Sequence, residues 1–157
     1  MEKTSAQDQA IALMSEVPAV YLTTIDHGGW PETRAMLNLR NKCRYPGLIP
    51  LFASHGKDLL LYFTTNTTSG KIAQIANNNK ASAYFCAPSE WRGLMLGGTV
   101  SVVSDIGIKG NLWQKEWTMY YPGGAEDPDY TILCLKPIVS RYYECLDSYS
   151  WNLEDES

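Results

Sequence analysis

Apolar and polar residues alternate along much of the chain, and this pattern predicts a mainly β protein. The segments 19–25 and 30–39 alternate on either side of Asp-His-Gly-Gly, which predicts a β-hairpin. A nearly continuous apolar run over 58–65 predicts a strand that is buried on both faces. The predicted strands are 19–25, 30–39, 58–65, 81–87, 92–104 and one long strand over 130–146 that Pro137 interrupts.

Three segments have helical periodicity, and one long segment has neither helical nor strand periodicity. Helices are predicted over 5–17, from about Ser69 with Ser69 or Thr68 as its cap, and over 107–120. The segment 40–57 contains Pro and Gly throughout, so we expect an irregular connection that is functional or mobile. The pair Gly97-Gly98 predicts a bulge inside a strand.

About six strands, three short helices and no βαβ alternation predict a small antiparallel barrel decorated by helices. The 157 residues fit a single domain over 1–157, with an acidic tail that we expect to be frayed over about 151–157. Five Trp and ten Tyr are many for this length. Such aromatic residues are as consistent with contacts to a partner surface or a flat ligand as with packing in a hydrophobic core.

Charge and composition exclude several classes of function. The net charge of -4 and the absence of any basic run argue against nucleic-acid binding. No apolar stretch reaches about 18 residues, so no membrane span is expected. The N-terminus lacks the pattern of a signal peptide, and we therefore expect a cytoplasmic protein.

The metal-ligating and nucleophilic residues are few and widely spaced. The four cysteines show no CxxC spacing, and His27 and His55 are the only histidines, so neither a metal site nor a Ser/His/Asp triad is expected. His27 lies in the predicted hairpin turn. Cys86, Cys134 and Cys145 lie in strand-like runs and are expected to be buried.

The stretch YFTTNTTSGKIAQI, residues 62–75, places five hydroxyl side chains, a glycine and Lys71 where a strand gives way to a helix. Such a place is either a polar turn or an anion site, because the start of a helix offers backbone N–H groups and a positive dipole. A nucleotide P-loop does not match, since Thr65 and Ile72 occupy two of its required positions. Arg34, on a neighbouring predicted strand and on the same face as Met36, is a second candidate cation.

Four motifs together resemble the FMN-binding split-barrel proteins related to pyridoxamine 5'-phosphate oxidase, most of all the bacterial general stress protein branch. They are Arg34-Ala35-Met36, the F-T-T-x-x-x-S-x-K run from Phe63 to Lys71, the run from Gly98 to Asp105, and LWQKEWTMYYPGGAEDPDYTILCLKP. The last is similar to the family's L-W-x(n)-W-F/Y-P-x-G-x-x-D-P-D signature and is the most specific. The resemblance covers residues 19 to about 144.

This resemblance implies a six-stranded antiparallel split β-barrel of the Greek-key type, and a homodimer with FMN at the interface. It implies that strand residues 34–37 line the isoalloxazine and the phosphate side, and that Thr64, Thr65, Ser69 and Lys71 hold the ribityl chain and phosphate. It also implies that two tryptophans approach the flavin from the partner chain. The implied cofactor-binding residues are Arg34, Ala35, Met36, Leu37, Phe63, Thr64, Thr65, Ser69, Gly70, Lys71, Trp113 and Trp117.

Three departures from the family pattern limit what the resemblance implies. Gly93 stands where the oxidases often carry a flavin-contacting Gln, and Gly70 stands where many members have a second basic residue. The chain ends in SYSWNLEDES and lacks the Arg-rich end of true pyridoxine phosphate oxidases, so oxidation of vitamin B6 is not expected. A flavin-dependent oxidoreductase, a non-catalytic FMN carrier or stress-related sensor, and a split barrel for heme or a deazaflavin remain as functional hypotheses.

Overall fold

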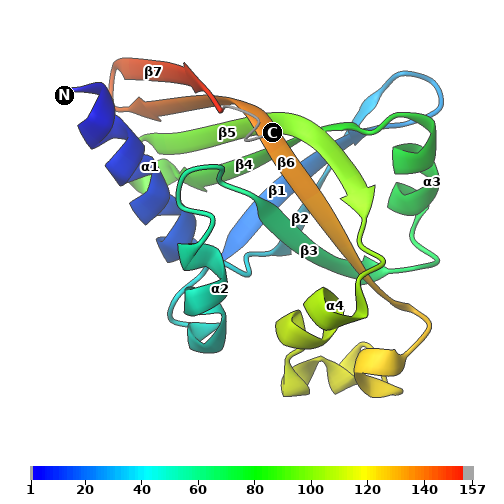
Figure 1. Ribbon diagram of the computed structural model, residues 1–157. Helices are drawn as coiled ribbons and strands as arrows, with labels where there is room; N and C mark the ends of the chain where they lie inside the picture. The colour runs from blue at the N-terminus through cyan, green and yellow to red at the C-terminus, as the bar shows by residue number, and fades with distance from the viewer. Residues whose placement is uncertain (1, 154–157) are drawn as a thin grey trace.

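The computed structural model describes residues 2–153 (Figure 1). One antiparallel sheet curls into an incomplete barrel, and the helices lie at its ends and edges. The strands are β1 (Ala19–Ile25), β2 (Pro31–Leu37), β3 (Leu61–Asn66), β4 (Lys80–Ala87), β5 (Arg92–Val102), β6 (Tyr130–Glu144) and β7 (Asp147–Asn152). The helices are α1 (Lys3–Glu16), α2 (Ile49–Ala53), α3 (Gly70–Asn77) and α4 (Ile106–Leu112), with 3-10 turns η1 (Pro46–Leu48), η2 (Pro88–Glu90), η3 (Lys115–Met119) and η4 (Gly124–Glu126).

The strand order is β2-β1-β4-β5-β6-β3, and β7 pairs with β6 beside this path. β3 lies next to β6 instead of next to β4, which is the Greek-key arrangement. β2 and β3 approach each other across the opening of the barrel, but the described residues show no hydrogen-bonded ladder between them. The six-stranded split barrel expected from the sequence is therefore confirmed, with β7 as a seventh strand that the sequence did not indicate.

The long strand β6 continues through Pro137, so the predicted interruption there is wrong. Pro137 lies where the neighbour on one edge of β6 changes, since β3 pairs with 130–135 and β7 pairs with 139–144. On this edge of β6, no strand among the described residues pairs with Pro137, so its missing N–H costs no ladder hydrogen bond there. The predicted bulge is confirmed, because the β5–β6 register shifts between Gly97 and Gly98. A Cβ at Gly98 would overlap the carbonyl oxygen of Lys136, which explains why glycine is found there.

Two hydrophobic cores lie on the two faces of β3 and β6. Alternate residues of β3, such as Leu61 and Phe63, point into the barrel core, to which α1 and α3 also contribute. Tyr62, and Leu60 just before the strand, belong to a second core that includes side chains of α4, η3 and the segment before α2. β3 is therefore buried on both faces, as its apolar run predicted.

Two predictions about the connecting segments are corrected by the structure. Residues 40–57 are not irregular throughout, because Pro46 begins η1 and Pro50 lies at the start of α2, where proline's fixed φ favours a helical turn. The helix predicted over 107–120 ends at Leu112. Trp113 is extended there (φ -55°, ψ 133°), so that its ring packs on Tyr130 with centroids 5.1 Å apart, and η3 follows separately.

The C-terminal segment is more ordered than its composition predicted. Trp151 lies in β7, is buried in the barrel core, and accepts a hydrogen bond at its carbonyl from Ser140 Oγ at 2.6 Å. The expected fraying is therefore wrong for 151–153, while 154–157 lie outside the described residues. Cys134 is buried as expected, Cys86 is half-buried, and Cys145 is exposed in the β6–β7 turn with φ 56°, which corrects its predicted burial.

Candidate functional site

A cavity of about 540 Å³ lies at the split of the barrel, where the edge strands β2 and β3 face each other. β2, β3 and α3 supply six of the residues that the sequence predicted, and other segments complete the wall. The lining residues are Pro18, Ala19, Ala35, Met36, Leu37, Arg44, Thr64, Thr65, Asn66, Lys71, Tyr120 and Tyr121. The split therefore brings the two ends of the predicted flavin site into one cavity.

β2 forms one wall of this cavity as an edge strand. Arg34 pairs with Leu22 and Met36 with Val20, both core residues of β1, so these two β2 residues share the face toward the barrel, as the period of two predicted. Ala35 lies on the opposite face of the sheet. Residues 35–37 all contact the cavity because it extends around the edge of the sheet.

Arg34 lies beside the cavity and is held by polar partners from three elements. Its Nη1 donates to Thr24 Oγ1 at 2.6 Å and to the Glu32 carbonyl at 2.8 Å. Its Nη2 lies 3.3 Å from the Glu32 carboxylate and 3.3 Å from the Gln74 side-chain oxygen. Because Glu32 is half exposed, this ion pair is weak, and the guanidinium remains a source of positive charge next to α3.

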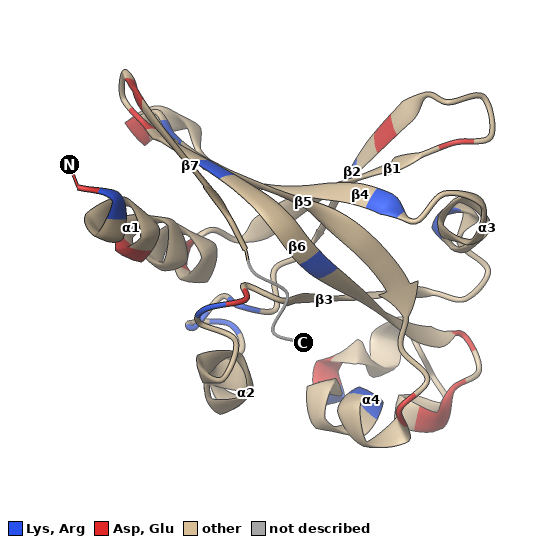
Figure 2. Cartoon of the chain, turned by 45° about the horizontal axis from the view of Figure 1, so that its top comes forward, with Lys and Arg blue, Asp and Glu red and all other residues tan. Residues whose placement is uncertain are grey.

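Lys71 is the only basic residue of α3, seen as the blue segment of that helix in Figure 2. Ser69 caps α3 by accepting a hydrogen bond from the Lys71 backbone N–H, and Lys71 Nζ donates to Ser69 Oγ at 2.8 Å. The cation thus lies at the positive end of the helix dipole. Burial, and secondarily the charge of Arg34, lower the pKa of Lys71. An anion at this place would relieve both unfavourable effects.

Gly70, the first residue of α3, is exposed, and a Cβ built there would meet no atom within 4 Å. The place of the basic residue found in many family members is therefore open space. Both Gly70 and Lys71 lie in the first turn of α3, where amide groups lack carbonyl partners within the helix, but the Lys71 N–H already donates to Ser69 Oγ. The local structure offers an anion the Gly70 N–H and one lysine, with room for a further side chain.

The hydroxyl-rich stretch proves to be largely structural. Thr67 Oγ1 bonds to Thr131 Oγ1 at 2.6 Å and to the Pro128 carbonyl at 2.8 Å, while Thr68 and Asn66 bond to the Asp129 carboxylate. These bonds fix the β3–α3 turn to the start of β6. Thr64 and Thr65 are the exceptions, since both line the cavity. Most of the hydroxyls that drew attention to this segment therefore position it and do not line the site.

Six lining residues were not predicted from the sequence: Pro18, Ala19, Arg44, Asn66, Tyr120 and Tyr121. Tyr121 OH lies 2.9 Å from Thr64 Oγ1, and burial raises the pKa of this tyrosine. Both tyrosines belong to the YYP of the recognised signature, so their signal was present in the sequence. Arg44 lies in the connection before η1, with its guanidinium 5.6 Å from the Tyr45 ring centroid. Nothing in the local sequence distinguished Arg44 from a surface residue.

Three predicted site residues are placed away from the cavity. Phe63 is fully buried in the barrel core. Trp117 is 1% exposed inside the second core, and the half-buried Trp113 packs against it with centroids 6.0 Å apart. Their packing supports Tyr121, whose ring lies 6.2 Å from that of Trp113. The approach of these tryptophans to a partner's flavin remains a prediction.

Gly93, which stands where the oxidases often carry a glutamine, lies beneath a pair of tyrosines. Tyr84 and Tyr143 come from the strands on either side of β5, and their hydroxyl oxygens are 2.5 Å apart. A Cβ at Gly93 would overlap the Tyr143 ring and the Tyr84 hydroxyl. Burial, and secondarily the hydrogen bond to Tyr143, raise the pKa of Tyr84. The tyrosine pair therefore occupies the space of the missing side chain.

The comparisons with known proteins agree with this architecture. The family model described as Pyridoxamine 5'-phosphate oxidase like matches residues 32–151, which is more than half of the chain. The chain therefore belongs to the pyridoxamine 5'-phosphate oxidase-like family. Among curated proteins compared by sequence, none matches this chain.

Many solved structures share the fold. A Clostridium acetobutylicum protein related to general stress protein 26 of B. subtilis is 27% identical with a TM-score of 0.78, and the match covers 98% of this chain and 97% of that one. An FMN-binding protein from Nostoc punctiforme, related to pyridoxamine 5'-phosphate oxidase, is 16% identical, with coverage of 94% and 86% and a TM-score of 0.60. A heme binding protein from Mycobacterium smegmatis is 13% identical with a TM-score of 0.68, with coverage of 97% of this chain and 60% of that one. The similarity to the first structure agrees with the expected general stress protein branch.

Within 2–153, no helix is both long and apolar enough to cross a membrane. In the same part of the chain, no three His, Cys, Asp or Glu side chains group in a way that could hold a metal ion.

Proposed function

We propose that the protein binds FMN at the split of the barrel, acts as a homodimer, and transfers electrons or hydride between a reduced donor and a small acceptor. The observation that carries this proposal is the convergence of Lys71, Arg44 and the first turn of α3 on a cavity with the flat edge of β2 as its wall. A flavin mononucleotide has the matching parts, a phosphate with roughly two negative charges and a flat apolar ring. Family membership and the FMN-binding relative support the same cofactor.

The residues of the cavity divide into those that fit the phosphate and those that fit the ring. The Ser69 hydroxyl, the Gly70 amide and the Lys71 ammonium would hold the phosphate, and Arg34 would add positive charge nearby. Residues 35–37 would lie along the isoalloxazine. The bound flavin supplies the redox chemistry. Among residues 2–153, the side chains that line this cavity are neutral or cationic, which suits positioning the ligand and neutralising its charge.

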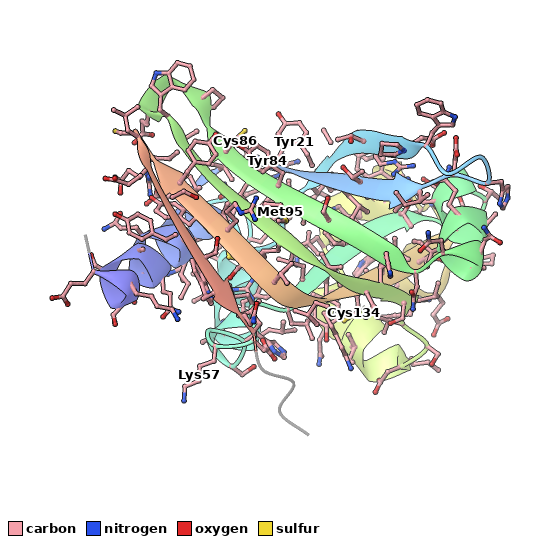
Figure 3. The ribbon with its side chains drawn as sticks, turned by 90° about the horizontal axis from the view of Figure 1, so that it is seen from above. Tyr21, Lys57, Tyr84, Cys86, Met95 and Cys134 are labelled. Atoms are coloured by element: carbon pink, nitrogen blue, oxygen red, sulfur yellow. The ribbon has the colours of Figure 1, made fainter. Side chains whose placement is uncertain are left out.

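The homodimer is proposed because, within the described residues, the sheet face that continues from the cavity is partly exposed. Ala35 pairs with Tyr21, Tyr21 with Tyr84, and Tyr84 with Met95, which makes one row across four strands from the cavity wall to the centre of the sheet. Figure 3 shows Tyr21, Tyr84, Cys86 and Met95 together on this face. A second copy placed here by a two-fold axis would cover both cavities at once.

The proposal is tested with the purified protein and its spectrum. We expect flavin absorbance, or its appearance after FMN is added, together with a dimeric mass by light scattering. Met95→Glu should yield monomers that bind FMN weakly, since it places a charge in the proposed interface. A colourless protein that does not bind added FMN would refute the flavin assignment, and a Soret band would assign the cavity to heme. A deazaflavin would be recognised by the mass of the ligand extracted from the protein.

Turnover separates the proposed enzyme from a non-catalytic carrier or stress-related sensor. We expect the FMN-loaded protein to oxidise a nicotinamide donor in the presence of an electron acceptor. Binding without turnover would support the carrier. Heme is the less favoured ligand, because neither His27 nor His55 lines the cavity and His55 Nδ1 is 3.0 Å from the Asp58 carboxylate. The expected cytoplasmic location remains a prediction.

A further inference from the structure

A second cavity, of about 140 Å³, lies between α1 and the segment that carries α2. Figure 1 shows these two helices next to each other at one end of the barrel. The cavity shares no lining residue with the candidate flavin cavity. Its lining is mostly apolar and includes Ile11 and Met14 from α1 and Leu39, Ile49 and Phe52 from the α2 segment. An engineered apolar cavity of about 150 Å³ holds benzene, so this space accommodates one small ring or a short alkyl chain.

Two cationic side chains line this apolar cavity, the exposed Lys42 and Arg40, which is only 9% exposed. Its Nη2 donates to the carbonyls of His55 at 3.1 Å and of Leu60 at 2.8 Å, and its guanidinium carbon lies 4.7 Å from the Phe52 ring centroid. These contacts fix the position of the guanidinium. They use only one of its three nitrogen atoms.

The positive charge of Arg40 lacks an anionic partner among the described residues. None of the ion pairs within 4 Å includes Arg40, and Asp58, whose charge acts on it from farther away, is engaged by His55 and by the backbone N–H of Leu60. Arg40 Nε is buried with no hydrogen-bond acceptor. Burial lowers the pKa of Arg40 to about 10, which still leaves it charged at neutral pH. Buried charges are normally paired, and this one is not.

The combination of an unpaired guanidinium and an apolar lining selects a class of ligand. A carboxylate matches the planar donors of arginine. An apolar body of about the size of benzene matches the remaining space. Inorganic phosphate matches less well, because the surrounding side chains of Met14, Leu39 and Phe52 offer it no hydrogen bonds.

We propose that this cavity is a binding site for a small monocarboxylate with an apolar body, with the carboxylate on Arg40 and the body against Ile11, Met14 and Phe52. Access is from the side where Ala53 and Lys42 are exposed. Lys42 adds a second cation near this entrance. The site is independent of the proposed flavin site.

Methionine methyl groups report on both cavities, which makes the test specific. Met14 lines the proposed carboxylate site and Met36 lines the flavin cavity. The full chain, labelled with ¹³C at its methionine methyls, is titrated with sodium benzoate, and benzyl alcohol is the uncharged control. We expect a saturable shift of the Met14 signal, no shift of Met36, and weaker binding of benzyl alcohol.

Two variants and one control complete the experiment. Arg40→Gln should weaken benzoate binding about tenfold or more, because it removes a charge-assisted hydrogen bond. Ala53→Trp should abolish binding by filling the entrance while Arg40 stays in place. Lys57→Gln removes an exposed cation of the same segment that does not line this cavity, labelled in Figure 3, and should bind benzoate like the unmodified chain.

Several results would overturn the proposal. They are an unresponsive Met14 signal, equal shifts of Met14 and Met36, and unchanged affinity in a folded Arg40→Gln variant. If Arg40→Gln does not fold, Ala53→Trp decides, and benzoate binding that survives this variant with its melting temperature intact rejects the site.

Discussion

Reversing the charge of Lys71 is the sharpest test of the phosphate end of the candidate flavin site. A lysine about 4 Å from a phosphate charge contributes roughly 4 kcal/mol at an effective dielectric constant near 20. Lys71 is only half-buried, so solvent and salt reduce this to about 1–1.5 kcal/mol for each unit of charge. Lys71→Glu changes the charge by two units. We therefore expect FMN to bind about 2–3 kcal/mol more weakly, a factor of roughly 30 to 160.

The assay is quenching of flavin fluorescence at fixed ionic strength, with FMN and riboflavin titrated in parallel. Riboflavin lacks the phosphate, so its affinity should hardly change in Lys71→Glu. Lys80→Glu is the matched control, because Lys80 is an exposed lysine at the start of β4 that does not line the cavity. Unchanged FMN affinity would place the phosphate elsewhere. Equal losses for FMN and riboflavin would mean that the variant disturbs the fold and not a phosphate contact.

Three further variants or probes address other parts of the structure. Gly70→Arg should bind FMN about fivefold more tightly at low salt, because the space beside Gly70 is open and an added exposed charge contact contributes roughly 1 kcal/mol. Weaker binding would contradict the proposed phosphate position. Gly93→Gln should lower the free energy of unfolding by about 1–3 kcal/mol in a urea titration, since the new side chain must displace the Tyr84–Tyr143 pair. An unchanged midpoint would show that the two tyrosines move aside at little energetic cost. Burial raises the pKa of the Cys134 thiol to about 11, so at pH 8 this thiol should resist alkylation in the folded protein and react on unfolding. Mass spectrometry follows the labelling, and rapid labelling of the folded chain would contradict the burial of this thiol.

The sequence predicted the barrel well because its strands carry strong local signals. The two-sided apolar run of β3 and the glycine pair in β5 both kept their predicted roles, since each reflects a requirement of the backbone or of the core at that position. β7 was missed because Ser148 and Ser150 give its sequence little apolar character, and only tertiary pairing with β6 makes it a strand.

The candidate site was predicted only where a motif and local geometry coincide. Lys71 and Thr64 follow directly from the strand-to-helix run around them, and both line the cavity. Arg44 could not be predicted, because its position depends on how the connection before η1 folds over Tyr45. Trp117 differs from both, since its motif predicted a flavin contact from the partner chain while its ring lies in the second core of its own chain, and that contact remains a prediction.

The pairing of β6 has a consequence for the cooperativity of unfolding. This one strand of 15 residues bonds to β5 on one side, and on the other side first to β3 and then to β7. Local opening of the split leaves the β5–β6 ladder intact, and detachment of the C-terminal strand also leaves it intact. The amide hydrogens of this shared ladder should therefore exchange with solvent only when the whole chain unfolds, whereas β2, paired on one edge only, can open and close beside it. The fold thus combines a β5–β6 ladder that stays formed until global unfolding with an edge strand, β2, that is able to move where the ligand would enter.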